Sequence, residues 1–74
     1  MLVRVKLSQD SNRRYTYYSP VAVSSGTYVV VAMPNGSLKT VLVTSVIRTN
    51  ETTTHNGHEI KPIFGIVQEI KHED

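Results

Sequence analysis

The chain contains no cysteine, so disulfide bonds and thiolate zinc sites are both excluded. The absence suits a reducing compartment. No apolar run reaches the roughly 18 residues that a membrane-spanning helix requires. The first residues alternate between apolar and basic side chains, which is unlike the continuous apolar core of a signal peptide. We therefore expect a cytoplasmic protein with no membrane contact.

Neither sign of charge strongly predominates. Eight Lys and Arg residues stand against six Asp and Glu residues, which gives a formal net charge of +2. This mild excess permits an acidic partner without requiring one. Alanine and other strong helix formers are few, whereas valine, threonine and tyrosine are common, and such branched and aromatic side chains suit strands. The 74 residues predict a single small all-β domain over residues 1–74.

Five segments have the apolar patterns of strands, and turn residues separate them. They are residues 2–7, 13–18, 27–33, 38–47 and 59–71. The third and fifth are apolar on both faces over part of their length, and a curled sheet would bury that surface and remove free edges. We predict a closed or nearly closed five-stranded barrel, SH3-like or related, built as an antiparallel meander. Residues 48–59 are expected to form an exposed loop or a long hairpin tip, and residues 72–74 a frayed tail.

The Pro-Asn-Gly segment at 34–36 decides how the third and fourth strands pair. A two-residue Asn-Gly turn would place Val31 opposite Thr40. A three-residue loop, with its glycine in the left-handed conformation, would instead place Val29 opposite Val41. Only the second register puts the valines of both strands on one face, and a slip of one residue would reverse every side chain. The sequence favours the three-residue loop.

Three pieces of sequence resemble a known family in their order. They are Arg-Tyr-Thr-Tyr at 14–17, Ser-Gly-Thr-Tyr-Val-Val-Val at 25–31 and Phe-Gly-Ile-Val at 64–67. This layout is similar to that of the N-terminal DNA-end-binding domain of the primosomal replication-restart helicase. With Asn-Gly-Ser-Leu-Lys at 35–39, it also resembles small β-barrel proteins of unknown function encoded by bacteriophages. The resemblance implies a small barrel and, for a phage-encoded protein, the host cell cytoplasm.

Arginines and tyrosines interleave in residues 13–18. On a barrel surface this mixture suits the stacking of unpaired bases and contacts with phosphates. It suits a protein partner as well, because Tyr and Arg are frequent anchors at interfaces. The candidate nucleic-acid- or partner-binding residues are Arg13, Arg14, Tyr15, Tyr17, Tyr18, Lys39 and Arg48, and Arg4 and Lys6 would extend the charge if they point the same way. In the alternative, structural interpretation, one set of rings belongs to the core and the arginines are solvated.

Two histidines near an Asn-Gly pair raise the question of a metal site. His55 and His58 have Glu51 and Glu59 nearby, but the Asn-Gly between them is typical of a turn, and no third ligand is fixed. The segment is better interpreted as a hydrophilic loop tip, so neither a metal nor a cofactor is expected. The sequence has no recognisable nucleophile with an orienting base and no glycine-rich phosphate loop, so we do not expect an enzyme.

The sequence therefore predicts a small non-enzymatic binding module that contacts nucleic acid or a protein that handles nucleic acid, and the resemblance implies that it is phage-encoded. Two alternatives stay open. One is a protein-docking inhibitor or adaptor of a host protein. The other is a self-associating structural component of a phage assembly, which an apolar patch around Phe64 and Ile66 would indicate.

Overall fold

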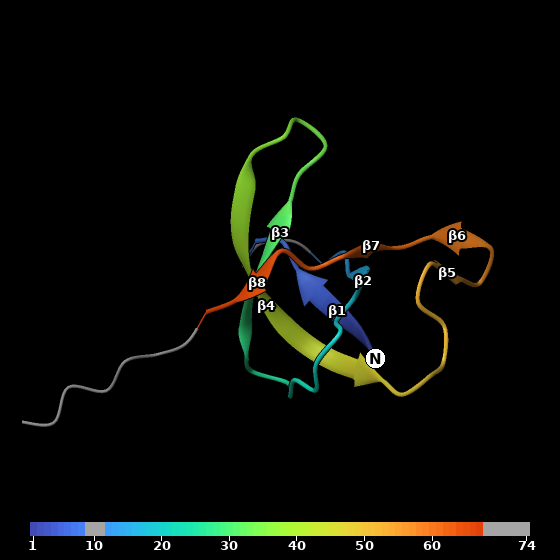
Figure 1. Cartoon of the computed structure of the whole chain (residues 1–74). Helices are drawn as coiled ribbons and strands as arrows, with labels where there is room; N and C mark the ends of the chain where they lie inside the picture. Colours follow the sequence, from blue (N-terminus) through green and yellow to red (C-terminus); the bar gives the residue numbers. More distant parts are fainter. Residues whose placement is uncertain (9–11, 68–74) are drawn as a thin grey trace, which may run out of the picture.

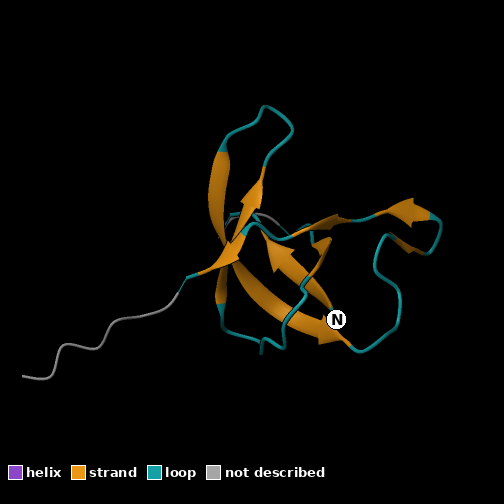
Figure 2. Cartoon of the chain, in the orientation of Figure 1, coloured by secondary structure: helices purple, strands orange, loops and turns teal. Residues whose placement is uncertain are grey.

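The computed structural model describes residues 1–8 and 12–67, and the tail expected at 72–74 lies outside them. The described residues form strands, turns and loops with no helix (Figure 2), so the all-β prediction is confirmed. No helix that could cross a membrane occurs in this part of the chain. The strands are β1 Leu2–Lys6, β2 Tyr15–Tyr18, β3 Tyr28–Ala32, β4 Leu38–Ile47, β5 Thr54–His55, β6 His58–Glu59, β7 Lys61–Pro62 and β8 Gly65–Ile66.

Six of these strands form one sheet in the order β7-β2-β1-β4-β3-β8. Neighbours in the sheet run antiparallel except β2 and β7, which run parallel. A register shift between Arg4 and Val5 marks an irregularity where β1 pairs with β4, and bulges of this kind increase the local twist and bend of a sheet. The sheet curls into a half-barrel (Figure 1). The predictions of a closed five-stranded barrel and of a purely antiparallel meander are therefore wrong.

The segment expected to be one final strand is instead divided between the two edges of the sheet. β7 pairs with β2, β8 pairs with β3, and only Ile63 and Phe64 lie between them. The N–H of Ile63 donates to the carbonyl of Tyr18 at 2.8 Å, whereas the N–H of Phe64 donates to the carbonyl of Val30 at 2.7 Å. Pro62 has no N–H to donate, which favours the end of a ladder at that residue. The half-barrel is thus bridged by a chain crossing rather than closed by a continuous strand; residues 68–71 lie outside the described part.

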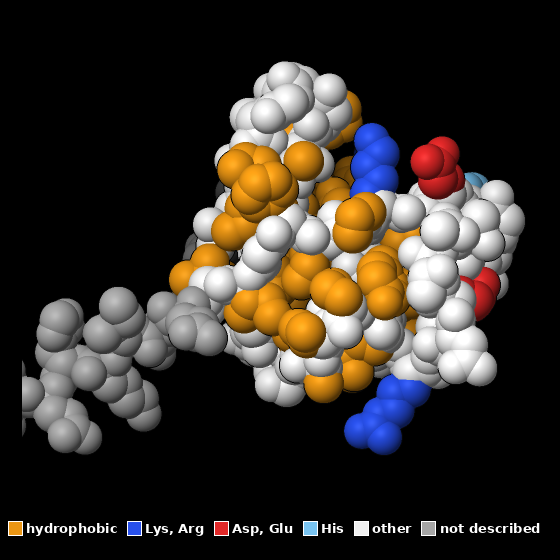
Figure 3. Space-filling model, in the orientation of Figure 1, with side chains coloured by type: hydrophobic (Ala, Val, Ile, Leu, Met, Phe, Trp, Pro, Cys, Tyr) orange, Lys and Arg blue, Asp and Glu red, His pale blue; other side chains and the backbone are white. Residues whose placement is uncertain are grey.

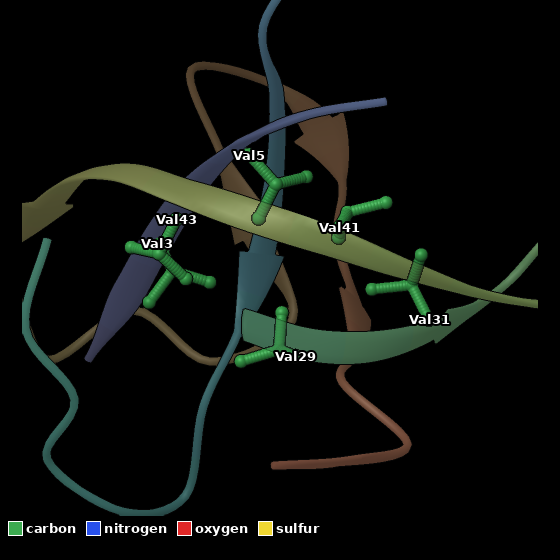
Figure 4. Close-up of a cluster of buried hydrophobic side chains, with 6 residues drawn as sticks. All are labelled: Val3, Val5, Val29, Val31, Val41 and Val43. Atoms are coloured by element: carbon green, nitrogen blue, oxygen red, sulfur yellow. The ribbon is translucent and has the colours of Figure 1, made fainter. Parts of the chain in front are cut away.

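The core is made almost entirely of valine. Six fully or almost fully buried valines form one cluster, Val3, Val5, Val29, Val31, Val41 and Val43 (Figure 4). They occupy alternate positions on β1, β3 and β4, as the period of a strand requires. Partly buried side chains, among them Tyr17 and Ile63, pack against this cluster.

The β3–β4 turn has the three-residue form that the sequence favours. Val29 lies opposite Val41, and Val31 lies opposite Lys39. The N–H of Gly36 donates to the carbonyl of Met33 at 2.8 Å, and Gly36 has a φ of 86°, in the left-handed region. The prediction of the register and of the glycine conformation is confirmed.

Part of the polar segment 48–59 forms a second, two-stranded sheet. β5 and β6 pair around Asn56 and Gly57, whose φ angles of 51° and 80° are both positive. Two consecutive positive φ angles characterise the type I′ turn that suits a tight hairpin. Ile60 follows the hairpin, is buried, and donates its N–H to the carbonyl of Thr53 at 2.7 Å. Of the two forms expected for this segment, the structure has the hairpin tip.

Candidate functional site

A groove of about 560 Å³ lies where the start of β2 meets the β5–β6 hairpin. Ala32 and Pro34, from the β3–β4 hairpin, also line it. In Figure 3 a basic side chain stands in the notch between the upper lobe, formed by the β3–β4 hairpin, and the lobe on the right, formed by the β5–β6 hairpin. The curl of the sheet and the two hairpins therefore create a concave surface that neither hairpin would form alone.

Strand β2 brings two tyrosines to this groove. Tyr15 lies opposite Val5 and Tyr17 lies opposite Val3, so both rings belong to the face of the sheet that carries the core. Tyr17 packs against the valine cluster, and burial, with a smaller contribution from Tyr15, raises the pKa of its hydroxyl. Tyr15 is 38% exposed. One ring is thus largely structural, and the other is available to a ligand.

Three basic residues line the groove, and each comes from a different segment. Arg4 is on β1, Arg14 directly precedes β2, and Lys61 begins β7 opposite Tyr17. Glu59 is the only carboxylate among the described residues that line it. At neutral pH the groove therefore carries more positive than negative charge, which favours an anionic ligand.

The hairpin contributes both of its histidines to the groove. His55 lies directly opposite His58 in the β5–β6 pair. The Nδ1 atom of His55 is 2.8 Å from the Oε1 atom of Glu51, and the same Oε1 accepts a hydrogen bond from the hydroxyl of Thr49 at 3.3 Å. Within the part of the chain that the structure describes, no three His, Asp or Glu side chains are grouped so as to hold a metal ion.

The structure separates the candidate residues into two groups. Arg14, Tyr15 and Tyr17 meet in the groove, and Arg4, which was expected to extend the charge, joins them. The others lie elsewhere: Arg13 is exposed next to Arg14, Tyr18 pairs with Leu2 on the opposite face, Lys6 and Lys39 lie on β1 and β4, and Arg48 lines a separate depression beside Met1.

Sequence reasoning missed Lys61 and did not connect His55 and His58 with the tyrosines. Lys61 reaches the groove only because β7 pairs in parallel with β2, and a two-residue strand has no periodicity that would indicate this pairing. The interleaved Arg and Tyr residues of β2, in contrast, were a local signal and could be read directly.

A second exposed feature lies along the β3–β8 edge. Phe64 is 70% exposed, and Tyr28, Ile66 and Val67 are also exposed. The N–H of Val67 donates to the carbonyl of Tyr28 at 3.0 Å, so these residues are neighbours on that edge. Figure 3 shows hydrophobic side chains gathered on the face over β3 and β8, away from the acidic side chains of the β5–β6 lobe.

No protein-family model, curated protein or solved structure matches this chain. The chemistry of the groove is therefore the main guide to what the protein binds.

Proposed function

We propose that this protein is a small, non-enzymatic binding module whose groove holds single-stranded nucleic acid. The observation that carries the proposal is the presence of three basic residues and two tyrosines in the lining of one groove. Proteins that bind single strands without strict sequence preference combine these two elements: positive charge follows the phosphates, and aromatic rings stack on bases.

Each element has a distinct part in this mechanism. Arg4 and Lys61 contact phosphates, and their charge makes the affinity depend on salt because bound counterions are released. Tyr15 stacks on a base with its exposed ring. Tyr17, supported by the valine core, keeps Tyr15 and the strand around it in place.

The resemblance of three sequence segments to the DNA-end-binding domain of the replication-restart helicase supports the same class of partner. On the same ground we propose an SH3-like relationship for the half-barrel and a phage-encoded protein that acts in the host cytoplasm. A module of this kind would bind DNA exposed during replication and would need no cofactor.

The test is fluorescence anisotropy of a labelled oligo(dT) strand and of a labelled duplex, titrated with the protein at low and moderate salt. We expect the single strand to bind more tightly than the duplex, and its affinity to fall as salt rises. The double variant R4A/K61A should reduce the slope of log K against log[salt] by about 1.4, since each lost contact with single-stranded phosphate removes about 0.7.

The matched control is the double variant K39A/R48A, which removes the same charge from outside the groove. It should leave the salt slope close to that of the unmodified protein. Equal losses in the two double variants would show that the groove is not the binding surface. No binding at low salt would overturn the proposal.

The exposed edge favours one alternative, self-association through a second copy of the chain. Phe64 and its neighbours form an apolar patch beside the short edge strand β8, and exposed patches of this kind often mark interaction sites. A stable oligomer in sedimentation velocity that dissociates in F64S would support this alternative. Docking onto a host protein is the remaining one, and its affinity would follow the aromatic anchors more than salt.

A further inference from the structure

The ring of His55 is held in one orientation by Glu51. A carboxylate can only accept hydrogen bonds, so the Nδ1 atom of His55 carries the hydrogen in their 2.8 Å contact. In the neutral ring the other nitrogen, Nε2, is then an acceptor, and the amide nitrogen of Asn56 lies 3.4 Å from it. Protonation would convert Nε2 into a donor while Nδ1 continues to donate to Glu51. Nε2 is therefore the atom that donates to a ligand when the ring carries both hydrogens.

His58 provides a second imidazole on the same surface. Residues directly opposite in an antiparallel pair have their side chains on one face, so the rings of His55 and His58 are neighbours. Both line the groove. No hydrogen bond or ion pair to the His58 ring occurs among residues 1–8 and 12–67, so its nitrogens are available to a ligand.

We infer that His55 and His58 form a phosphate contact of the groove that operates when the rings are protonated, so that acidic pH strengthens the binding of a nucleic-acid strand. This inference rests on the proposed function and assigns the hairpin side of the groove to the strand's backbone. Tyr15 is left to contact a base.

The charged groups around the two rings explain why a bound phosphate would favour their protonation. Three cations of the same groove oppose further positive charge: Arg4, Arg14 and Lys61. Two carboxylates favour it, Glu59 in the groove and Glu51 in its contact with His55. The remaining titratable groups in the groove are Tyr15 and Tyr17. A bound phosphate offsets the repulsion among the cations. Binding and protonation are therefore linked, and each strengthens the other by the same factor.

The experiment measures the affinity for labelled oligo(dT) by anisotropy at pH 8 and at pH 5.5, at fixed ionic strength. Thymine does not gain a proton in this range, so a change reports on the protein. Histidine side chains in general change charge between about pH 5 and 8. We expect the affinity to rise about five- to tenfold at the lower pH, as for one or two added ionic hydrogen bonds. The salt slope should steepen by about 0.7 for each added phosphate contact.

The variants H55N/H58N and H58N alone test the assignment. The double variant should lose the gain at pH 5.5 and the single variant part of it, with the gain of each variant taken relative to that variant's own affinity at pH 8. H58N removes no side-chain hydrogen bond or ion pair among the described residues, so it remains informative if the double variant is unstable by circular dichroism.

The matched control is H72N, which alters the third histidine of the chain. Loss of the acid gain in H72N, or a gain that persists in H55N/H58N, would overturn the inference. Binding at pH 8 with no gain at pH 5.5 would overturn it as well and leave the proposed function standing. No binding at either pH would overturn both.

Discussion

Met1 and Ser19 exchange main-chain hydrogen bonds across the start of the β1–β2 pair. The N–H of Ser19 donates to the carbonyl of Met1 at 2.8 Å, and the amino group of Met1 donates to the carbonyl of Ser19 at 3.0 Å. Ser19 is fully buried, and its hydroxyl donates to the carbonyl of Val21 at 2.6 Å. A single small polar residue thus ends β2, anchors the N-terminus and directs the chain into the next turn.

Replacing Ser19 by alanine should lower the free energy of unfolding by about 1 kcal/mol, because the partly buried hydrogen bond from its hydroxyl to the carbonyl of Val21 is lost. Urea denaturation followed by circular dichroism measures the change. The exposed Ser45, on β4, is the matched control, and S45A should change stability by no more than about 0.5 kcal/mol. Equal effects of the two substitutions would mean that the Ser19 hydroxyl contributes nothing specific.

The β3–β4 turn depends on glycine at one position. Gly36 has a φ of 86°, so G36A should lower the free energy of unfolding by about 1 kcal/mol through backbone strain. A steric clash adds nothing, because a Cβ there would meet no atom within 4 Å. Gly65 also has open space around it but has no positive φ, so G65A should leave the thermal midpoint nearly unchanged. A drop of about 4–8 °C confined to G36A is the expected result for a domain of this size. Similar midpoints for the two variants would contradict it.

Tyr17 should make the protein less stable at alkaline pH. Burial raises the pKa of its hydroxyl above the ordinary value of about 10. Below about pH 10 the tyrosine is protonated in both states, and its contribution to the free energy of unfolding is fully present. Above that pH the unfolded chain releases the proton of this residue first. The free energy of unfolding therefore falls until the pH passes the raised pKa. Urea midpoints at pH 9 and pH 11 should therefore differ less in Y17F than in the unmodified protein. The control is Y28F, at a tyrosine that is 52% exposed, and it should retain the difference in urea midpoint of the unmodified protein. If the difference between pH 9 and pH 11 is the same in Y17F and Y28F, Tyr17 has no special role.

Tyr15 should contribute to binding without contributing much to the fold. If its ring stacks on a base, Y15A should weaken the binding of oligo(dT) by about 1–3 kcal/mol, which is roughly five- to 150-fold. The matched substitution is Y28A, which removes a tyrosine that is more exposed and lies outside the groove. Anisotropy titrations of both variants at one salt concentration decide the matter. A comparable loss in Y28A would place the strand on the β3–β8 edge instead.

The sequence was sufficient for the parts of the fold that repeat with a regular period. Alternation located β1, β3 and β4, and the apolar faces on either side of 34–36 selected the register that buries Val29 with Val41. The division of the last predicted strand could not be foreseen, because β7 and β8 have two residues each and their partners lie far away in the chain. Long-range pairing of this kind depends on how the sheet curls, and no local pattern encodes it.

The candidate site was predictable to the same extent. Arg14, Tyr15 and Tyr17 lie within one short segment of the sequence, so their mixture of charge and aromatic rings was visible before the fold was known. Lys61 and His58 join them only through the crossing of the chain and the type I′ hairpin. The sequence placed the histidines correctly on a tip but gave no indication that this tip forms one side of a groove.

One segment supplies both edge strands, and this has a consequence for folding during synthesis on the ribosome. Until residues 61–67 have emerged, β2 and β3 each lack the neighbour that pairs with them in the folded chain. A nascent chain in which residues 61–67 have not yet emerged therefore carries two open sheet edges, and the arrival of this one segment covers both. Such edges can pair with other chains, so a translational pause that holds residues 61–67 inside the ribosome should increase aggregation, whereas a pause after these residues have emerged should not.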